Sequence, residues 1–198
     1  MDCTQISKMF KALASKLNFN FGGCLTVDSF CRININVKKT VVYCVNTLPS
    51  YSAANLGHWI AFIVKRNSVI FFDSYAVPLK LYHSLFTGFL EKCRRNKKRV
   101  YNISLHVQDE NSLICGLYAL LSIKVLLTYG IKKFNMIFLK MFPRTSSKKT
   151  NDNVVLSYFY QHKDEYYTPS NCIDTFCGKD DDACKNRCDG ASRTSSIR

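Results

Sequence analysis

The sequence predicts an α+β domain in which helices flank a central mixed or antiparallel sheet. Short runs rich in β-branched and aromatic residues alternate with longer segments whose apolar residues recur at helical spacing. The chain has 198 residues, of which 47% are hydrophobic and 21% charged, so it is long enough to bury a sizeable core. We find no internal repeat, and the elements are therefore expected to share one core.

The first half of the chain predicts a helix followed by strands. Apolar residues at helical spacing predict a helix over 5–17, and the residues around Gly22-Gly23 are expected to form turns. Strands are predicted at 40–46, 58–65 and 68–73. Because only Lys65-Arg66-Asn67 separates the last two, they are expected to form a hairpin.

The second half of the chain is expected to be mainly helical. A helix is predicted over 79–95 and a strand over 100–107, followed by a central helix at 117–129 and a short one at 133–141. Asn151-Asp152 suit an N-cap, so the last helix is expected to start there. In the helix over 79–95, the residues expected to face inward are Leu81, Leu85, Phe89 and Leu90.

The composition changes near residue 168, which predicts a domain over 1–168 and a flexible, cysteine-rich tail over 169–198. The tail has too few apolar residues to join a core. Its cysteines lack the tight spacing of common zinc sites, so we expect a loose reduced segment, with zinc or two disulfides as the alternatives. These cysteines are Cys172, Cys177, Cys184 and Cys188.

The chain is strongly basic, which favours a polyanionic partner. Lys and Arg total 28 against 14 Asp and Glu, giving a formal charge of +14. The densest cluster is predicted to contact DNA phosphates without sequence specificity, and a merely solvated basic surface is the alternative. It comprises Lys92, Arg94, Arg95, Lys97, Lys98 and Arg99, and the pairs Lys38-Lys39, Lys132-Lys133 and Lys148-Lys149 could extend it.

Nothing in the sequence favours secretion or a membrane. The N-terminus MDCTQISKMF has no secretory hydrophobic region, and the cysteines scattered through the body of the chain are expected to be reduced thiols. The longest apolar stretch, 113–131, contains Lys124 and is expected to be a buried core helix. We expect a monomer that is neither secreted nor membrane-bound.

One cysteine has the surroundings that a nucleophile requires. Cys115 is predicted at a helix N-terminus, where the helix dipole favours the thiolate. His58 opens one strand of the predicted hairpin and Asp73 closes the other, so they are expected at the same end of the sheet as base and orienting carboxylate. Gln108, seven residues before Cys115, could donate to an oxyanion. A buried structural cysteine is the alternative, and His106 is the rival base.

These stretches resemble the adenovirus-type cysteine protease family, adenain. The resemblance rests on VNTLPS…GHWIAF, FFDSYA and VQDENSLICGLYAL, and it spans about residues 5–168. It implies a papain-like fold with the inverted order His, Asp, Gln, Cys, which the wider clan shares with proteases of ubiquitin-like modifiers. It implies that Trp59 flanks the imidazole, with a core aromatic as the alternative, and that Asn111 and Ser112 shape the loop. Gly116 is expected to let the backbone approach a substrate.

The sequence departs from the family at specific positions. Mammalian adenovirus members have Glu where this chain has Asp73, and Gly-Pro where it has Asp109-Glu110, whose carboxylates we expect to face solvent. The family is stimulated by viral DNA and by a viral peptide held through a disulfide. No cysteine falls at the equivalent position, and Cys93 is the nearest. The departures suggest a distant relative from another large DNA virus or a virus-derived element.

Together these features predict a cysteine endopeptidase that processes viral capsid and core precursor proteins during virion maturation, at small-residue, Gly-containing sites. It is expected in the virion and host nucleus, stimulated by DNA and requiring no cofactor for the chemistry. Three alternatives stay open at this point. They are a deconjugating protease of a ubiquitin-like modifier, an acyltransferase on the same scaffold, and a non-catalytic basic DNA-binding packaging protein.

Overall fold

The computed structural model describes residues 3–52 and 57–166. A compact unit spans Met1–Tyr166. The predicted tail over 169–198, with its candidate zinc ligands Cys172, Cys177, Cys184 and Cys188, lies outside the described residues.

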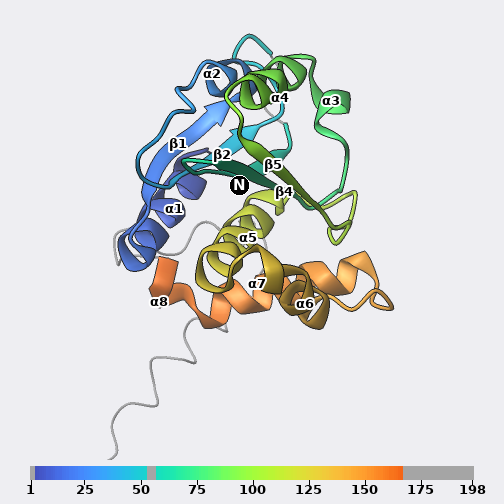
Figure 1. The fold of residues 1–198 in the computed structure, drawn as a ribbon. Helices are drawn as coiled ribbons and strands as arrows, with labels where there is room; N and C mark the ends of the chain where they lie inside the picture. Colours follow the sequence, from blue (N-terminus) through green and yellow to red (C-terminus); the bar gives the residue numbers. More distant parts are fainter. Residues whose placement is uncertain (1–2, 53–56, 167–198) are drawn as a thin grey trace, which may run out of the picture. The chain divides into compact units, whose positions relative to one another are not determined.

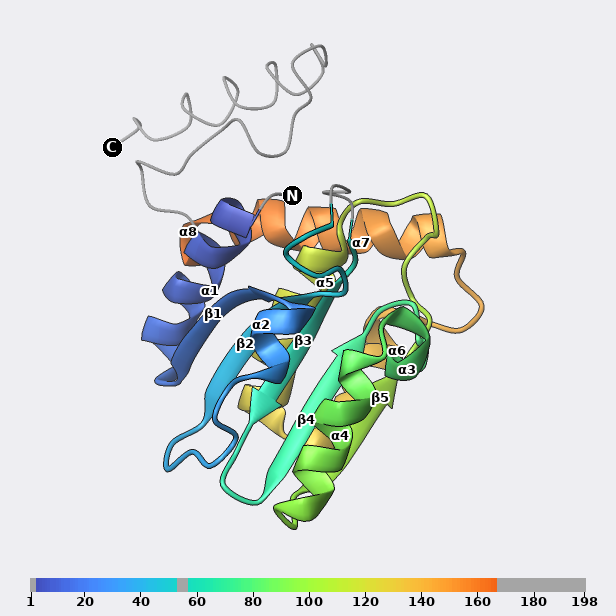
Figure 2. The same cartoon turned by 90° about the horizontal axis from the view of Figure 1, so that it is seen from above.

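A five-stranded mixed sheet forms the centre of this unit, and its strands lie in chain order (Figure 2). The outer pairs, β1 with β2 and β4 with β5, are parallel, whereas β3 is antiparallel to both of its neighbours. The predicted hairpin of β3 and β4 is present, and its turn closes with a 2.8 Å hydrogen bond from Lys65 N to Ser68 O. The strands are β1 (Asn20–Thr26), β2 (Val41–Asn46), β3 (Trp59–Val64), β4 (Ser68–Asp73) and β5 (Arg99–Ser104).

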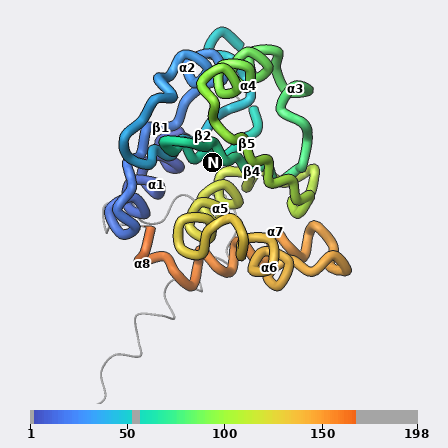
Figure 3. The backbone as a smooth tube through the Cα atoms, viewed as in Figure 1, coloured from blue at the N-terminus to red at the C-terminus, as the bar shows by residue number. Residues whose placement is uncertain are grey.

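Helices cover both faces of the sheet, which confirms the predicted α+β class (Figures 1 and 3). One face carries α2 (Val27–Cys31), α3 (Leu79–Tyr82) and α4 (Leu85–Arg95). The other carries α5 (Cys115–Tyr129), which packs on β3 and contacts α1 (Cys3–Leu17), α6 (Ile131–Met141) and α7 (Lys148–Gln161). The short α8 (Lys163–Tyr166) contacts α1 and α7.

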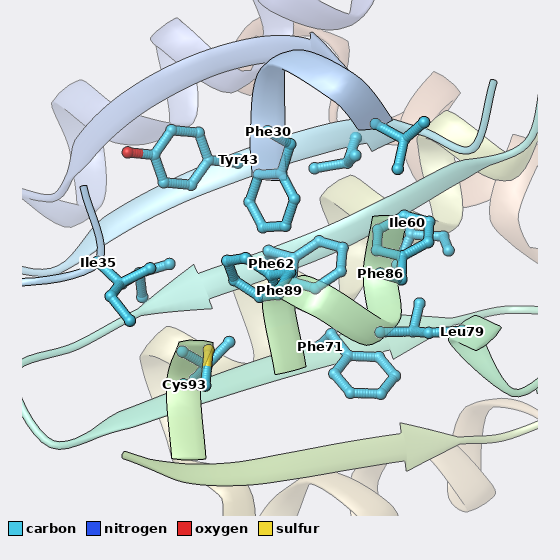
Figure 4. Packing of buried hydrophobic residues seen from close by; sticks show 14 residues of the cluster. Phe30, Ile35, Tyr43, Ile60, Phe62, Phe71, Leu79, Phe86, Phe89 and Cys93 are labelled. Carbon is cyan, nitrogen blue, oxygen red and sulfur yellow. The ribbon is translucent and has the colours of Figure 1, made fainter. Parts of the chain in front are cut away.

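Aromatic side chains fill the space between the sheet and the α2–α4 layer (Figure 4). The Phe30 ring lies 4.4 Å from that of Phe62 and 4.6 Å from that of Phe89, measured between centroids. All three side chains are fully buried. Their packing fixes α2 and α4 on the central strands, so this layer is a rigid support for the sheet ends.

The expectation of turns around Gly22-Gly23 is wrong, because both glycines lie within strand β1. A side chain at Gly22 would collide with the Tyr43 ring, since its Cβ would fall 2.1 Å from a ring carbon. Gly23 has φ +115° and sits where the pairing with β2 shifts register. The glycines therefore serve close packing and a bulge in an edge strand, although in sequence they look like turn residues.

The predicted helix over 79–95 is broken, because His83 adopts an extended conformation and separates α3 from α4. The break shifts the buried positions to Leu79, Phe86, Phe89 and Cys93. Leu81 is 68% exposed and Leu85 38% exposed, so the expectation that they face inward is wrong. The error arose because one continuous helix was assumed over 79–95, whereas the break changes which residues face the core.

The last long helix begins earlier than predicted. α7 starts at Lys148 and is capped by Ser147, whose Oγ accepts from Thr150 N. Asn151 and Asp152, predicted as the cap, are instead buried inside the helix. Their side chains form long-range hydrogen bonds, described with the site below.

Lys124, the charge within the apolar stretch, is paired. Its Nζ donates to Glu165 at 2.5 Å and to the Tyr158 hydroxyl at 2.6 Å, both from the helices that cover α5. In the described part of the chain, no helix is long and apolar enough to cross a membrane.

Candidate active site

The antiparallel pairing of β3 and β4 brings the predicted base and carboxylate together. His58 precedes β3 and Asp73 ends β4, so both lie at one end of the sheet. His58 Nε2 lies 2.7 Å from Asp73 Oδ1. The two side chains are 8% and 0% exposed, so water does not screen this pair.

The contacts between the end of β2 and the residues before β3 explain why VNT and GHW occur together. A Cβ on Gly57 would fall 1.8 Å from Asn46 Oδ1, so only glycine leaves room for that amide. The amide oxygen accepts from Leu48 N at 2.9 Å. Thr47 Oγ1 accepts from His58 N at 3.1 Å, and Thr47 N donates to His58 O. The backbone of His58 is therefore held on both sides by the end of β2.

Asp73 accepts four hydrogen bonds, two at each oxygen. Oδ1 accepts from His58 and from Tyr75 N at 2.9 Å, and Oδ2 accepts from Val77 N at 2.8 Å and from the Tyr82 hydroxyl at 2.9 Å. Burial disfavours the carboxylate, but the hydrogen bond and charge of His58 and these further donors lower the pKa of Asp73. The carboxylate is thus ionised and fixed in rotation.

Cys115 is the first residue of α5 and is 8% exposed. Burial raises the pKa of its thiol, but the hydrogen bond and charge of His58, with the backbone N–H groups of Trp59 and Gly116, lower it below the ordinary value. Burial likewise opposes the imidazolium, yet Asp73 and Cys115 raise the pKa of His58 to about 9. The site therefore favours a thiolate–imidazolium pair.

The two imidazole nitrogens of His58 have separate roles. Nε2 is held by Asp73, whereas Nδ1 is buried and is bonded by no nitrogen or oxygen of the described residues. This leaves Nδ1 as the nitrogen for the Cys115 thiol, with the carboxylate on the far side of the ring.

Gln108 is fully buried and its amide is fixed at both ends. Oε1 accepts from the Ser74 hydroxyl at 2.6 Å, and Nε2 donates to Ser112 O at 2.9 Å. Among the described residues, the amide nitrogen makes one further contact, a long one of 3.5 Å to Ser112 Oγ. One of the two N–H groups is thus committed to the loop before Cys115.

The loop between Gln108 and Cys115 is shaped by its own polar residues. Asp109 Oδ1 accepts from Asn111 N, Ser112 N donates to Asp109 O, and Ser112 Oγ lies 3.4 Å from Ile114 N. The Asp109 carboxylate is thus turned onto its own loop, and Glu110 is exposed. Neither carboxylate is among the main influences on the pKa of Cys115.

Buried polar side chains of α5 and α7 form a hydrogen-bond network with the backbone at the start of this loop. Asn151 Nδ2 donates to Val107 O at 3.0 Å, and the Tyr118 hydroxyl donates to Asp152 Oδ1 at 2.8 Å. Asp152 Oδ1 also accepts from Asp109 N at 3.4 Å. These contacts were not predicted from the sequence, where Asn151-Asp152 resembled a helix cap.

Two of the predicted shaping residues make contacts that the sequence did not predict. Trp59 contributes its backbone N–H to Cys115, and the rings of Tyr75 and Tyr82 lie against the imidazole, at 4.4 Å and 5.6 Å between centroids. Gly116 is buried, and a Cβ there would fall 2.7 Å from the end of the Ile6 side chain. Its small size therefore serves the packing of α1 on α5.

Tyr75 and Tyr82 were not predicted as site residues, although FFDSY places the first within two residues of Asp73. The second was hidden by the break after α3. The rival base His106 is exposed beyond the end of β5, and its ring makes an edge contact with Tyr75 at 6.4 Å between centroids.

The basic cluster lies at the opposite end of the sheet, around the end of α4 and the start of β5. Two of its members are bound to backbone carbonyls. Lys92 Nζ donates to Ile33 O, and the buried Lys98 Nζ donates to Lys65 O and Arg66 O. The members exposed to solvent are Arg94, Arg95, Lys97 and Arg99.

Within residues 3–52 and 57–166, no group of three or more His, Cys, Asp or Glu side chains is placed to hold a metal ion. The structure has reduced thiols at Cys24, Cys31, Cys44, Cys93 and Cys115.

Comparison with known proteins gives a likeness of fold. No protein-family model matches the chain, and no curated protein is similar to it in sequence. The fold is similar to that in a crystal structure of the selenomethionine form of the ASFV pS273R protease, with a TM-score of 0.53. The two chains are 13% identical over 85% of this chain and 68% of the other. The likeness shows a shared α+β fold, and the adenovirus-type assignment remains a prediction.

Proposed function

We propose that this chain is a cysteine endopeptidase. The observation that carries the proposal is the placement of Cys115, at the N-terminus of α5, beside a buried imidazole whose other nitrogen is held by Asp73. This combination supplies a nucleophile, a base and an orienting group. The fold shared with the ASFV pS273R protease supports the same reading.

In the proposed reaction, the Cys115 thiolate attacks the scissile carbonyl carbon and a C–S bond forms. The C–N bond then breaks, and the departing amine takes the proton from His58. Water, deprotonated by His58, then attacks the acyl carbon and the C–S bond breaks, which releases the acid and restores the thiolate–imidazolium pair. Asp73 keeps its negative charge throughout and stabilises the imidazolium.

The oxyanion is proposed to be held by the backbone N–H of Cys115 and by the remaining N–H of the Gln108 amide. Support comes from the rigidity of that amide, since Ser74 and Ser112 fix both of its ends. A donor that is fixed before the reaction need not reorganise in the transition state.

We further propose that the substrates are viral capsid and core precursor proteins, cleaved at Gly-containing sites during maturation in the virion and host nucleus. This part rests on the motif resemblance to adenain. The experiment incubates the full chain with a Gly-containing capsid-type peptide, with conjugates of a ubiquitin-like modifier, and with acyl-coenzyme A plus a lysine peptide. Peptide cleavage supports the proposal, whereas turnover of conjugates alone or acyl transfer without cleavage overturns it.

Alkylation by iodoacetamide at neutral pH tests the nucleophile directly. The hydrogen bond from the neighbouring Cys44 thiol lowers the pKa of Cys24, so this second cysteine is also expected to react. Labelling must therefore be mapped residue by residue. In His58→Ala, labelling of Cys115 is expected to fall while that of Cys24 persists. An equal loss at both positions, or none at Cys115, contradicts the mechanism.

Stimulation by DNA is proposed to act through the exposed cations at the far end of the sheet. Lys38 and Lys39 precede β2, and Arg66 lies in the β3–β4 turn, so they share this end with the exposed members of the basic cluster. Such a surface attracts phosphate without reading sequence, and bound DNA would concentrate enzyme and substrate together.

A further inference from the structure

We propose that Tyr82 is a positioning residue that holds Asp73, and through it His58, in the reactive arrangement. This inference rests on the proposed cysteine endopeptidase function. It concerns a residue outside the His58–Asp73–Gln108–Cys115 set.

The first observation is the contact that Tyr82 makes with the carboxylate. Its hydroxyl donates to Asp73 Oδ2 at 2.9 Å, while His58 binds the other oxygen at 2.7 Å. The remaining donors to the carboxylate, at Tyr75 and Val77, are backbone N–H groups of the turn after β4. Apart from His58, Tyr82 is thus the side chain that restrains rotation of Asp73 in the described structure.

The second observation is that the Tyr82 ring also lies along the imidazole. The two ring centroids are 5.6 Å apart and the planes are inclined by 22°. One side chain therefore contacts both members of the pair, its ring packing beside the base and its hydroxyl binding the carboxylate. Substitution by phenylalanine removes only the second contact.

The third observation concerns the charge of Asp73. The carboxylate is fully buried, and the positive charge beside it belongs to His58. A buried carboxylate depends on donors to remain ionised, and a phenol donating to an anion is a strong one. Loss of this donor leaves Oδ2 with a single backbone partner, which weakens the support of the imidazolium.

The local fold shows why Tyr82 is placed there. α3 ends at Tyr82, and His83 turns the chain into an extended conformation before α4. Leu79, one helical turn earlier, is buried in the aromatic core and anchors the short helix. The break that separates α3 from α4 thus orients the phenol toward the end of β4.

The test follows the pH dependence of Cys115 alkylation, mapped by mass spectrometry, in the wild type, Tyr82→Phe and Tyr129→Phe. Tyr129 is 53% exposed and serves as the matched control. An Asp73 carboxylate that has lost one hydrogen-bond donor stabilises the imidazolium less, so the Cys115 thiolate forms at higher pH. The midpoint, the pH at which Cys115 alkylation is half-maximal, is expected to rise by about 0.5 to 1 unit in Tyr82→Phe, which corresponds to the free energy of one hydrogen bond. A profile that coincides with Tyr129→Phe overturns the inference.

Replacement of Tyr82 by 3,5-difluorotyrosine covers the case in which the phenylalanine variant does not fold. It keeps the ring and strengthens the donor, so the midpoint is expected to move to lower pH, and an unmoved midpoint overturns the inference. Alkylation needs no peptide substrate. A shifted midpoint in a chain that cleaves no peptide supports Tyr82 as a positioning residue while the endopeptidase function fails.

Discussion

The two ends of the sheet carry their charges in opposite ways. At the end with His58, Asp73 and Cys115, the charges are buried and each has a specific partner. At the other end, the exposed cations of the basic cluster surround two lysines, Lys92 and Lys98, whose ammonium groups bind backbone carbonyls. The proposed function of the first end depends on the geometry of its hydrogen bonds, and that of the second end depends on the number of exposed cations.

This difference teaches how each end should respond to substitution. A buried network loses its function when one member is removed, because the remaining groups keep their desolvation cost without their partner. A solvated set of cations loses affinity gradually, since each phosphate contact contributes a similar, salt-dependent amount. The following predictions test this contrast, from the largest expected effect to the smallest.

Replacement of the nucleophile should abolish the proposed activity. In Cys115→Ala, peptide cleavage is expected to fall by about 10³-fold or more, because no other group can form the acyl intermediate. The measurement is kcat/KM on a Gly-containing peptide, with folding checked by thermal unfolding. Cys31→Ala is the control, since burial raises the pKa of that thiol to about 11 and it lies outside the site. Equal activity losses in both variants would sink the assignment.

Lys98 is expected to contribute to the free energy of unfolding and not to catalysis. Lys98→Met leaves the carbonyls of Lys65 and Arg66 without their ammonium donor, and we expect the free energy of unfolding to fall by about 1–3 kcal/mol. Urea denaturation measures it, and the exposed Lys97→Met is the control, with an expected change under about 0.5 kcal/mol. If the two variants unfold at the same urea concentration, the structural role of Lys98 is refuted.

Loss of the exposed basic cluster should weaken DNA binding without affecting basal cleavage. The combined change of Arg94, Arg95, Lys97 and Arg99 to Ala is expected to lower duplex affinity about tenfold at low salt and to flatten its salt dependence. Fluorescence anisotropy against salt concentration measures both. A control of equal charge changes four exposed lysines elsewhere to Ala: Lys8, Lys11 and Lys16 on α1 and Lys140 on α6. If it weakens binding as much, net charge rather than the sheet end is responsible.

The pH profile should show the raised pKa of His58. The imidazolium is present below a pKa of about 9 and is lost above it, so acyl transfer lacks its proton donor at higher pH. We expect kcat/KM to fall to half near pH 9, and Asp73→Asn to move this alkaline limb to lower pH. An alkaline limb that is the same in Asp73→Asn and the wild type would contradict the pairing of His58 with Asp73.

Much of the site geometry followed from local sequence features. A short turn between two β runs brought residues 58 and 73 together, because strand pairing relates the start of one strand to the end of the next. The glycine pair at 22–23 was wrongly predicted as a turn, because the sequence does not distinguish a glycine needed for packing against Tyr43 from one needed for a turn. The break at His83 was equally hidden, because both segments are helical and apolar.

The sequence alone determined the class of fold, the hairpin, and the chain order of His58, Asp73, Gln108 and Cys115, since these depend on periodicity and spacing along the chain. Only the tertiary structure decided which groups complete the site: the Tyr82 phenol on Asp73, the Asn46 amide against Gly57, and the α7 side chains beneath Gln108. Their positions depend on packing between distant elements, and a pattern of local spacing carries no information about such contacts.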